Sequence, residues 1–213
     1  MLHNDSQKMR VFLVLLVYLV TSSAFAANNL GCRDDNGDLV DWFYLYKIPS
    51  NENFNGNVLN THSEDSGYNY LYITSSSTNK NWMLSKKLMN ESSSASGHTL
   101  SESVYGNSKN LVVLYNDQPP NSNGLESRGH SKGVLVSDGE KGFWIIHSIP
   151  HFPPSLEASN IYDYPKTGRI YGQSFLCISL NDDQIDIVGK QLTYNEVQVY
   201  SSQVPDSFKY GLF

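Results

Sequence analysis

The sequence predicts an α/β fold in which a mixed β-sheet is flanked by short helices. Apolar runs of strand length, rich in Val, Ile, Tyr and Trp, recur between clusters of Gly, Pro, Asn and Asp. Segments with helical spacing lie between these runs. With 213 residues, of which 39% are hydrophobic, the chain is long and apolar enough for one domain with its own core.

The first 26 residues are predicted to be a secretory signal peptide. Lys8 and Arg10 precede the apolar run VFLVLLVYLV, and Ala24 and Ala26 have the small-x-small spacing of a cleavage site. The apolar run has about ten residues, whereas a membrane span needs roughly 20, so no membrane anchor is expected. We therefore expect cleavage after Ala26, a single domain over residues 27–213, and secretion.

Six apolar segments that end at turn residues are predicted to be strands. They are residues 38–50, 68–74, 110–120, 133–137, 143–146 and 173–180. The sequence DGEKG joins the fourth segment to the fifth and is a hairpin signal, so these two strands are expected to pair.

Two segments have helical spacing, and two others are predicted to be loops. A short helix is expected over residues 81–92, and a second from Asp182 to near Gly189. The Ser-rich residues 92–103 are expected to form a mobile loop. The Pro-rich residues 149–168 are expected to form a long irregular loop of the kind that often carries function.

Cys32 and Cys177 are the two cysteines of the chain. In a secreted protein such a pair usually forms a disulfide, and two buried free thiols are the alternative. Asn90 begins the sequon Asn-Glu-Ser within a Ser-rich stretch and is predicted to be a glycosylation site.

The charge of the chain limits its partners. Without residues 1–26 the chain has 13 Lys and Arg against 20 Asp and Glu, a net charge of −7. Such a protein is not an obvious nucleic-acid binder at neutral pH. Five histidines remain, and their protonation near pH ~5 would bring the charge to about −2. An acidic compartment therefore weakens this electrostatic objection.

The motif GHSKGVLVSD (residues 129–138) places His130 and Lys132 at the start of a buried strand. Residues two apart in an extended segment share a face, so both side chains are expected to project together. Lysine can bind a phosphate oxygen, and histidine can act as nucleophile, base or acid. A surface His–Lys pair without chemistry is the alternative, and the commoner meaning of such a triplet.

Further polar residues are expected near this motif. If the predicted hairpin forms, His147 lies at the same open end as His130. The alternative is a structural histidine at a strand end, with its hydrogen bonds satisfied and no part in chemistry. Asn116, Asp117 and Gln118 follow a strand and are candidates to orient His130 or line a polar pocket, the alternative being a plain turn.

The sequence has no motif for a bound metal or organic cofactor. It contains no Cys/His metal spacing, no P-loop, no dinucleotide fingerprint and no GxSxG nucleophile motif. We therefore expect a mechanism without metal or cofactor.

Six ordered segments of the chain together resemble the N-terminal half of the deoxyribonuclease II family. The resemblance covers residues 31 to about 204. The segments are GCRDDNGDLVDWFYLYKIP, YNDQPP, RGHSKGVLVSD, GFWIIHSIPHFPP, YGQSFLCISL and GKQLTYNEVQVY. Several matches at consistent spacing are far more specific than a single HxK.

The resemblance implies a phospholipase D-type fold of two similar lobes, each giving one HxK to a central cleft. One histidine attacks phosphorus to form a phosphohistidine, the other protonates the leaving 5′ oxygen, and water releases a 3′-phosphate. By this resemblance His130 and Lys132 are the pair of the N-terminal lobe, and His147 is a further important histidine. Cys32 and Cys177 match a disulfide pair. The resemblance also implies DNA as substrate and a lysosomal or secreted enzyme.

The sequence departs from the family pattern in two ways. The aspartate of the broader fold's HxK-x4-D pattern would fall on Ser137, whereas here Asp138 follows one step later, as in deoxyribonuclease II. The 213 residues contain one HxK, and the two-histidine mechanism needs an acid and a nucleophile on opposite sides of phosphorus.

Three possibilities follow from the single HxK. A homodimer can supply the second motif across a two-fold axis. An inactive secreted protein that binds DNA or a host molecule is the second possibility, and a truncated sequence the third. We expect an acid, metal-independent endodeoxyribonuclease, with the inactive binding protein as the alternative.

Overall fold

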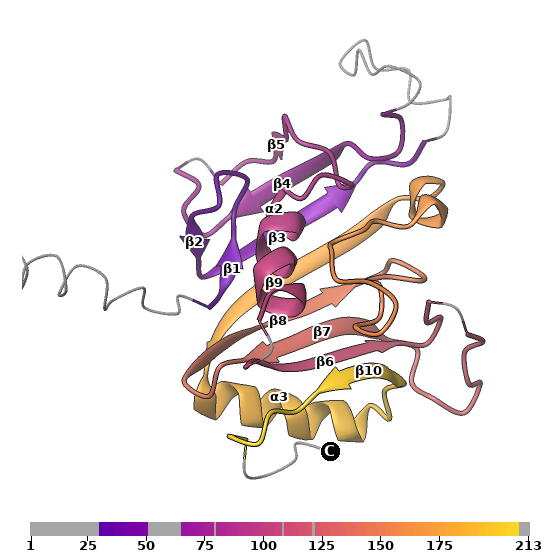
Figure 1. Ribbon diagram of the computed structural model, residues 1–213. Helices are drawn as coiled ribbons and strands as arrows, with labels where there is room; N and C mark the ends of the chain where they lie inside the picture. Colours follow the sequence, from indigo (N-terminus) through magenta and orange to yellow (C-terminus); the bar gives the residue numbers. More distant parts are fainter. Residues whose placement is uncertain (1–29, 51–64, 79, 108, 121, 209–213) are drawn as a thin grey trace, which may run out of the picture.

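The computed structural model describes residues 30–50, 65–78, 80–107, 109–120 and 122–208 (Figure 1). The predicted signal peptide and its cleavage site after Ala26 lie outside the described residues. Within the described ranges, no helix combines the length and apolar character needed to cross a bilayer.

The described part of the chain forms one large sheet and one small sheet. The large sheet has eight strands in the order β10-β6-β7-β8-β9-β3-β4-β5, and the small sheet pairs β1 with β2. The strands are β1 (Cys32–Arg33), β2 (Leu39–Val40), β3 (Trp42–Lys47), β4 (Tyr70–Thr74), β5 (Met83–Leu84), β6 (Leu111–Asn116), β7 (Lys132–Ser137), β8 (Lys141–His147), β9 (Gln173–Asn181) and β10 (Val199–Gln203).

The predicted α/β class is confirmed, and the sheet differs from expectation in one respect. Each strand pair in the described residues is antiparallel, so the sheet is not mixed. The predicted hairpin of β7 and β8 is confirmed, with Gly133 opposite Ile146 and Ser137 opposite Gly142. Short turns of this kind join antiparallel neighbours, which accounts for the pairing. Strand β10 was not predicted.

The central strands β6 and β7 are buried at every residue because both faces of the sheet are covered. On one face Val113 and Leu135 pack against the longer helix α3 (Asp182–Tyr194). On the other, Val112 and Val134 belong to a larger core that includes Leu100 and Val104. The absence of a side chain at Gly133 leaves room for the Tyr115 hydroxyl, which accepts a hydrogen bond from Trp144 Nε1 at 2.9 Å.

Helix α3 confirms the prediction of a helix from Asp182, although it continues beyond Gly189 to Tyr194. Asn181 caps it through a capping box with Gln184, which satisfies two backbone donors of the first turn. Its buried side chains are Ile185, Val188 and Leu192, at the spacing of one helix face.

Helix α2 (Ala95–Leu100) and the π-helical turn η1 (Ser101–Tyr105) occupy the residues predicted to be a mobile loop, so that prediction was wrong. Ser94 caps α2 by accepting from Gly97 N, and Leu100 is fully buried. Tertiary packing thus makes a helix from a Ser-rich sequence with weak local preference. The helix predicted over 81–92 was also wrong, because Met83 and Leu84 pair with β4 as the edge strand β5.

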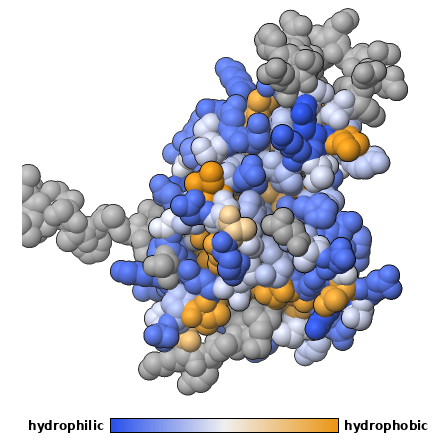
Figure 2. Space-filling model, turned by 45° about the vertical axis from the view of Figure 1, so that its right-hand side comes forward, coloured by the Kyte–Doolittle hydropathy of each residue, from blue (hydrophilic) through white to orange (hydrophobic). Residues whose placement is uncertain are grey.

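The loop between β8 and β9 crosses the face of the sheet that carries α2, and it is anchored by aromatic side chains. Phe152, Tyr162 and Tyr164 of this loop are buried in the larger core, and a single 3-10 turn, η2 (Lys166–Arg169), lies near its end. Figure 2 brings the right-hand side of Figure 1 forward and shows a mainly hydrophilic surface with separate hydrophobic spots.

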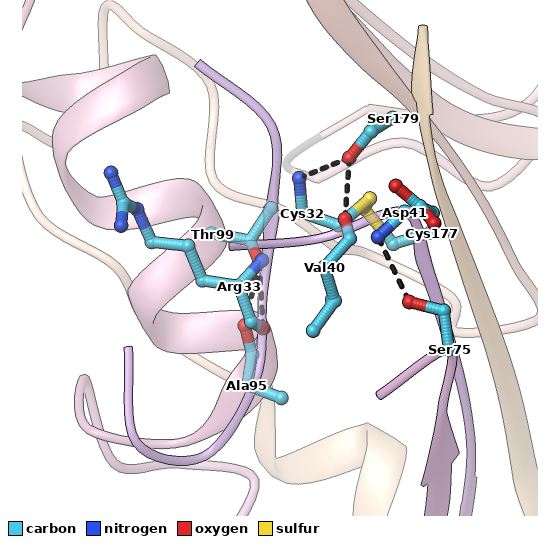
Figure 3. The surroundings of a disulfide bond; sticks show 9 residues. All are labelled: Cys32, Arg33, Val40, Asp41, Ser75, Ala95, Thr99, Cys177 and Ser179. Carbon is cyan, nitrogen blue, oxygen red and sulfur yellow. Dashed lines mark hydrogen bonds between the residues drawn. A yellow bond between two sulfur atoms is a disulfide. The ribbon is translucent and has the colours of Figure 1, made fainter. Parts of the chain in front are cut away.

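Cys32 of β1 and Cys177 of β9 form a disulfide, as predicted (Figure 3). Ser179 Oγ accepts from Cys32 N at 2.9 Å and donates to Val40 O at 2.7 Å, so the small sheet is held against β9 beside the disulfide. The bond joins residues 145 apart in sequence. In the chain-entropy model a loop of this length stabilises the fold by about 5 kcal/mol.

Candidate active site

One end of the large sheet gathers the predicted site residues. The C-terminal ends of β6 and β8 and the N-terminal ends of β7 and β9 meet there, at the right of Figure 1. Asn116 lies opposite Lys132, and His147 lies opposite Phe175. The pairing of Gly133 with Ile146 places Lys132 and His147 at the next opposed position. Asn116, Lys132 and His147 therefore form one row across three strands.

Asp117 joins the two members of the HxK motif. Its Oδ2 lies 2.7 Å from His130 Nδ1, and its Oδ1 pairs with Lys132 Nζ. The backbone supports this arrangement because Asp117 N donates to Ser131 O at 3.2 Å. One carboxylate thus orients both the imidazole and the ammonium group.

The two HxK side chains differ greatly in exposure. The His130 side chain is 89% exposed, whereas those of Lys132 and Asp117 are 6% and 11% exposed. A buried ammonium group needs a compensating charge, which Asp117 supplies. When the carboxylate accepts the Nδ1 hydrogen of a neutral imidazole, the Nε2 lone pair is left available. In this tautomer, Nε2 of the exposed His130 ring carries no hydrogen.

His147 is enclosed by the core. It is 6% exposed, and its ring centroid lies 5.4 Å from that of Phe152 and 6.1 Å from that of Phe175. Its Nδ1 accepts from Ile149 N at 3.1 Å, which places the hydrogen of the neutral ring on Nε2. Burial, and to a smaller extent the charge of Lys132, lowers the pKa of His147 to about 3.

The orphaned Nε2 of His147 is an unusual feature of this core. It is a buried polar atom without a hydrogen-bond partner among the described residues, and Ser131 Oγ is another. An unpaired buried donor costs about 1–3 kcal/mol, which makes this histidine an unfavourable choice for packing alone.

Asn116 and Gln118, the other two predicted pocket residues, point in different directions. Asn116 is fully buried, and its Nδ2 donates to Ile149 O at 3.1 Å and Phe152 O at 2.9 Å. Its Oδ1 accepts from Gln118 N at 2.8 Å. Asn116 therefore fastens the start of the Pro-rich loop to β6, while Gln118 is exposed beside Asp117.

His151, which was not among the predicted site residues, contacts the segment that follows Asp117. Its backbone N donates to Gln118 O at 2.9 Å, and its Nδ1 lies 3.0 Å from Pro119 O. His151 has a positive φ of 59°, which is uncommon for a residue with a side chain. The signal available in the sequence was a second histidine four residues after His147, within a Pro-rich loop.

The remaining predicted positions lie elsewhere. Ser137 ends β7 at the strand's opposite end from Lys132, and Asp138 accepts from Glu140 N and Lys141 N in the hairpin turn. Asn90 is exposed in the turn before α2. In the described ranges, no three His, Cys, Asp or Glu side chains are grouped so as to hold a metal ion.

Comparison with known proteins gives one family. The family model described as Deoxyribonuclease II matches residues 31–212. Human deoxyribonuclease-2-beta is 37% identical over 198 residues, which are 91% of this chain and 52% of the relative. Rat deoxyribonuclease-2-alpha is 39% identical over 186 residues, 85% of this chain and 51% of the relative.

A relative from a starfish is similar over the same region. Plancitoxin-1 of Acanthaster planci is 35% identical over 201 residues, which are 92% of this chain and 53% of the relative. The chain thus spans about half the length of the curated relatives it matches.

Proposed function

Because the chain belongs to the deoxyribonuclease II family, we propose that it is an endodeoxyribonuclease lobe that cleaves DNA phosphodiesters. The observation that carries this proposal is the double contact of Asp117 with His130 and Lys132. A carboxylate that fixes the imidazole tautomer and holds a cation beside it suits attack on a phosphate.

His130 is the nucleophile in this proposal. Its Nε2 lone pair attacks phosphorus, an N–P bond forms, and the bond from phosphorus to the 5′ oxygen breaks. Water then attacks phosphorus, the N–P bond breaks, and a 3′-phosphate end is released. Lys132 holds a non-bridging oxygen as a point charge, while Asp117 keeps the imidazole oriented and stabilises its cationic form.

The leaving 5′ oxygen needs a proton from the opposite side of phosphorus. His147 is a poor source, because it is enclosed and its pKa is about 3. We assign this role to the histidine of a second HxK, which another copy of the chain can supply across a two-fold axis. His147 instead assists indirectly, because its neutral ring adds no positive charge that would compete with Lys132 for the phosphate.

Acid conditions suit this mechanism because the second histidine must be protonated to act as an acid. They also reduce the negative charge of a chain whose net charge is −6 with neutral histidines. An acid optimum fits delivery to a lysosome or secretion into an acidic space, with DNA as substrate and no metal cofactor.

A secreted DNA-binding protein without turnover is the second candidate. The observation that favours it is the burial of Lys132, whose charge Asp117 already neutralises. Such a protein retains DNA at acid pH, and its affinity falls steeply as salt rises.

Plasmid nicking at pH ~5 in EDTA tests the proposal. We expect nicked plasmid, and a specific activity that rises with protein concentration because the second motif comes from another copy. His130→Ala should abolish nicking, and His98→Ala, on α2, serves as the matched histidine control. A folded protein that binds DNA without nicking it at any concentration would support the binding protein instead.

A further inference from the structure

A cavity of about 560 Å³ lies next to the loop that carries Asp117. Its walls come from Pro120, from the start of the Pro-rich loop at His151 and Pro154, and from Asp163, Pro165 and Lys166 near the end of that loop. The volume lies within the range of about 300–1,000 Å³ that is usual for small-molecule sites.

Two hydrogen bonds join His151, in the wall of this cavity, to the segment that follows Asp117. His151 N donates to Gln118 O at 2.9 Å, and His151 Nδ1 lies 3.0 Å from Pro119 O. Pro120 follows Asp117 by three residues. The wall of the cavity and the carboxylate that orients His130 are therefore parts of one short segment.

The His151 ring has a defined orientation in this wall. Because Nδ1 faces a carbonyl oxygen, it carries a hydrogen and donates, and Nε2 remains to contact a ligand. The backbone holds a left-handed conformation with φ 59° that residues with side chains rarely adopt. Backbone strain of this kind clusters at ligand sites, where surrounding structure maintains it.

We propose that this cavity binds the nucleotide next to the scissile phosphate, an inference that rests on the proposed function. Lys166 and the His151 ring contact the phosphate of that nucleotide, and the prolines supply rigid apolar walls for the sugar and base. Asp163 provides an acceptor for amino groups on a base. The face shown in Figure 2 is mainly hydrophilic, which suits a polar partner.

Salt dependence of DNA binding tests the inference. The probe is a fluorescent single-stranded oligonucleotide of about 12 nucleotides, bound to the full chain with His130→Ala to prevent turnover. Each lost phosphate contact on a single strand lowers the slope of log affinity against log salt by about 0.7. We expect Lys166→Met to lower the slope by this amount.

The matched control is Lys190→Met, which removes the same charge from an exposed position on α3, on the opposite face of the sheet. His151→Asn removes the ring and keeps a residue that tolerates the left-handed backbone, and we expect it to weaken binding. Circular dichroism checks that each variant is folded.

The outcomes separate this inference from the proposed function. If Lys166→Met and His151→Asn bind as Lys190→Met does, the cavity is not a nucleotide site, even if the wild-type chain nicks plasmid. The inference stands if Lys166→Met lowers the slope, Lys190→Met does not, and His151→Asn weakens binding. Absence of nicking by the wild type would then count against catalysis alone.

Discussion

Lys132 and His147 occupy opposed positions on neighbouring strands, and they lie in one buried row in which Lys132 has a carboxylate partner and His147 does not. The charge of Lys132 opposes protonation of His147, and burial opposes it more strongly, so the pKa of His147 falls to about 3. A neutral imidazole adds no second positive charge beside Lys132, whose ammonium group pairs with Asp117.

The low pKa of His147 predicts acid-sensitive stability. An ordinary histidine titrates near 6.5, so between pH ~6.5 and ~3 the unfolded chain binds a proton that the folded chain does not. The free energy of unfolding therefore falls as pH falls through this window, by about 2 kcal/mol from this group between pH 6.5 and pH 5.

His147→Phe should remove that contribution, since the ring would still pack between Phe152 and Phe175. Urea unfolding at pH 7 and pH 5 measures the difference for both proteins, and other titrating groups cancel in the comparison. Equal losses of stability in the two proteins on acidification would contradict the assignment.

Asp117→Asn should damage both chemistry and stability. The substitution leaves the buried ammonium group of Lys132 without a charge partner, which costs about 3–5 kcal/mol in such cases. It also leaves one acceptor oxygen where Asp117 has two, so His130 and Lys132 can no longer both be held. The double variant Asp117→Asn with Lys132→Met should recover part of the stability and none of the nicking. An Asp117→Asn protein as stable as the wild type would show that the pair is not formed.

Asn116→Ala should destabilise the fold by about 3 kcal/mol, because two buried carbonyl groups lose their donor and Gln118 N loses its acceptor. Gln118→Ala is the neighbouring control and should change stability by less than about 0.5 kcal/mol, since its side chain is exposed. Thermal unfolding of the two variants distinguishes them. Similar melting temperatures would mean that Asn116 does not hold the Pro-rich loop.

The disulfide should contribute strongly to stability. Cys32→Ala with Cys177→Ala is expected to lower the free energy of unfolding by about 3–5 kcal/mol, because the bond closes a loop across most of the described chain. Denaturant unfolding with and without reductant gives the same comparison for the wild type. A reduced protein that unfolds at the same denaturant concentration would contradict this expectation.

Asn90 is expected to carry a glycan when the chain is made in a secretory pathway, since the sequon is exposed in a turn. Mass spectrometry before and after glycosidase treatment measures the modification, and Asn90→Gln should remove it. An unmodified Asn90 in protein recovered from the secretory route would refute the prediction.

Local sequence pattern was sufficient for much of the sheet. β6, β7, β8 and β9 follow from apolar runs that end at turn residues, and α3 follows from its spacing. The pattern failed for α2, whose small polar residues gain helical structure only by packing, and for β5, whose side chains are exposed at the sheet edge. β10 escaped notice because a short edge strand has a weak apolar signal.

The site, too, has features that the sequence predicted and features that only the structure shows. The sequence predicted that His130 and Lys132 project together from one extended segment, whereas in the structure Lys132 begins β7 and His130 lies in a bend before it. It paired the two cysteines correctly by their number. Only the tertiary structure decided that Asp117 joins the pair and that His147 is sealed beside Lys132. The physical reason is that contacts between separate strands, and the burial that shifts a pKa, depend on register and packing across the sheet rather than on neighbours in the chain.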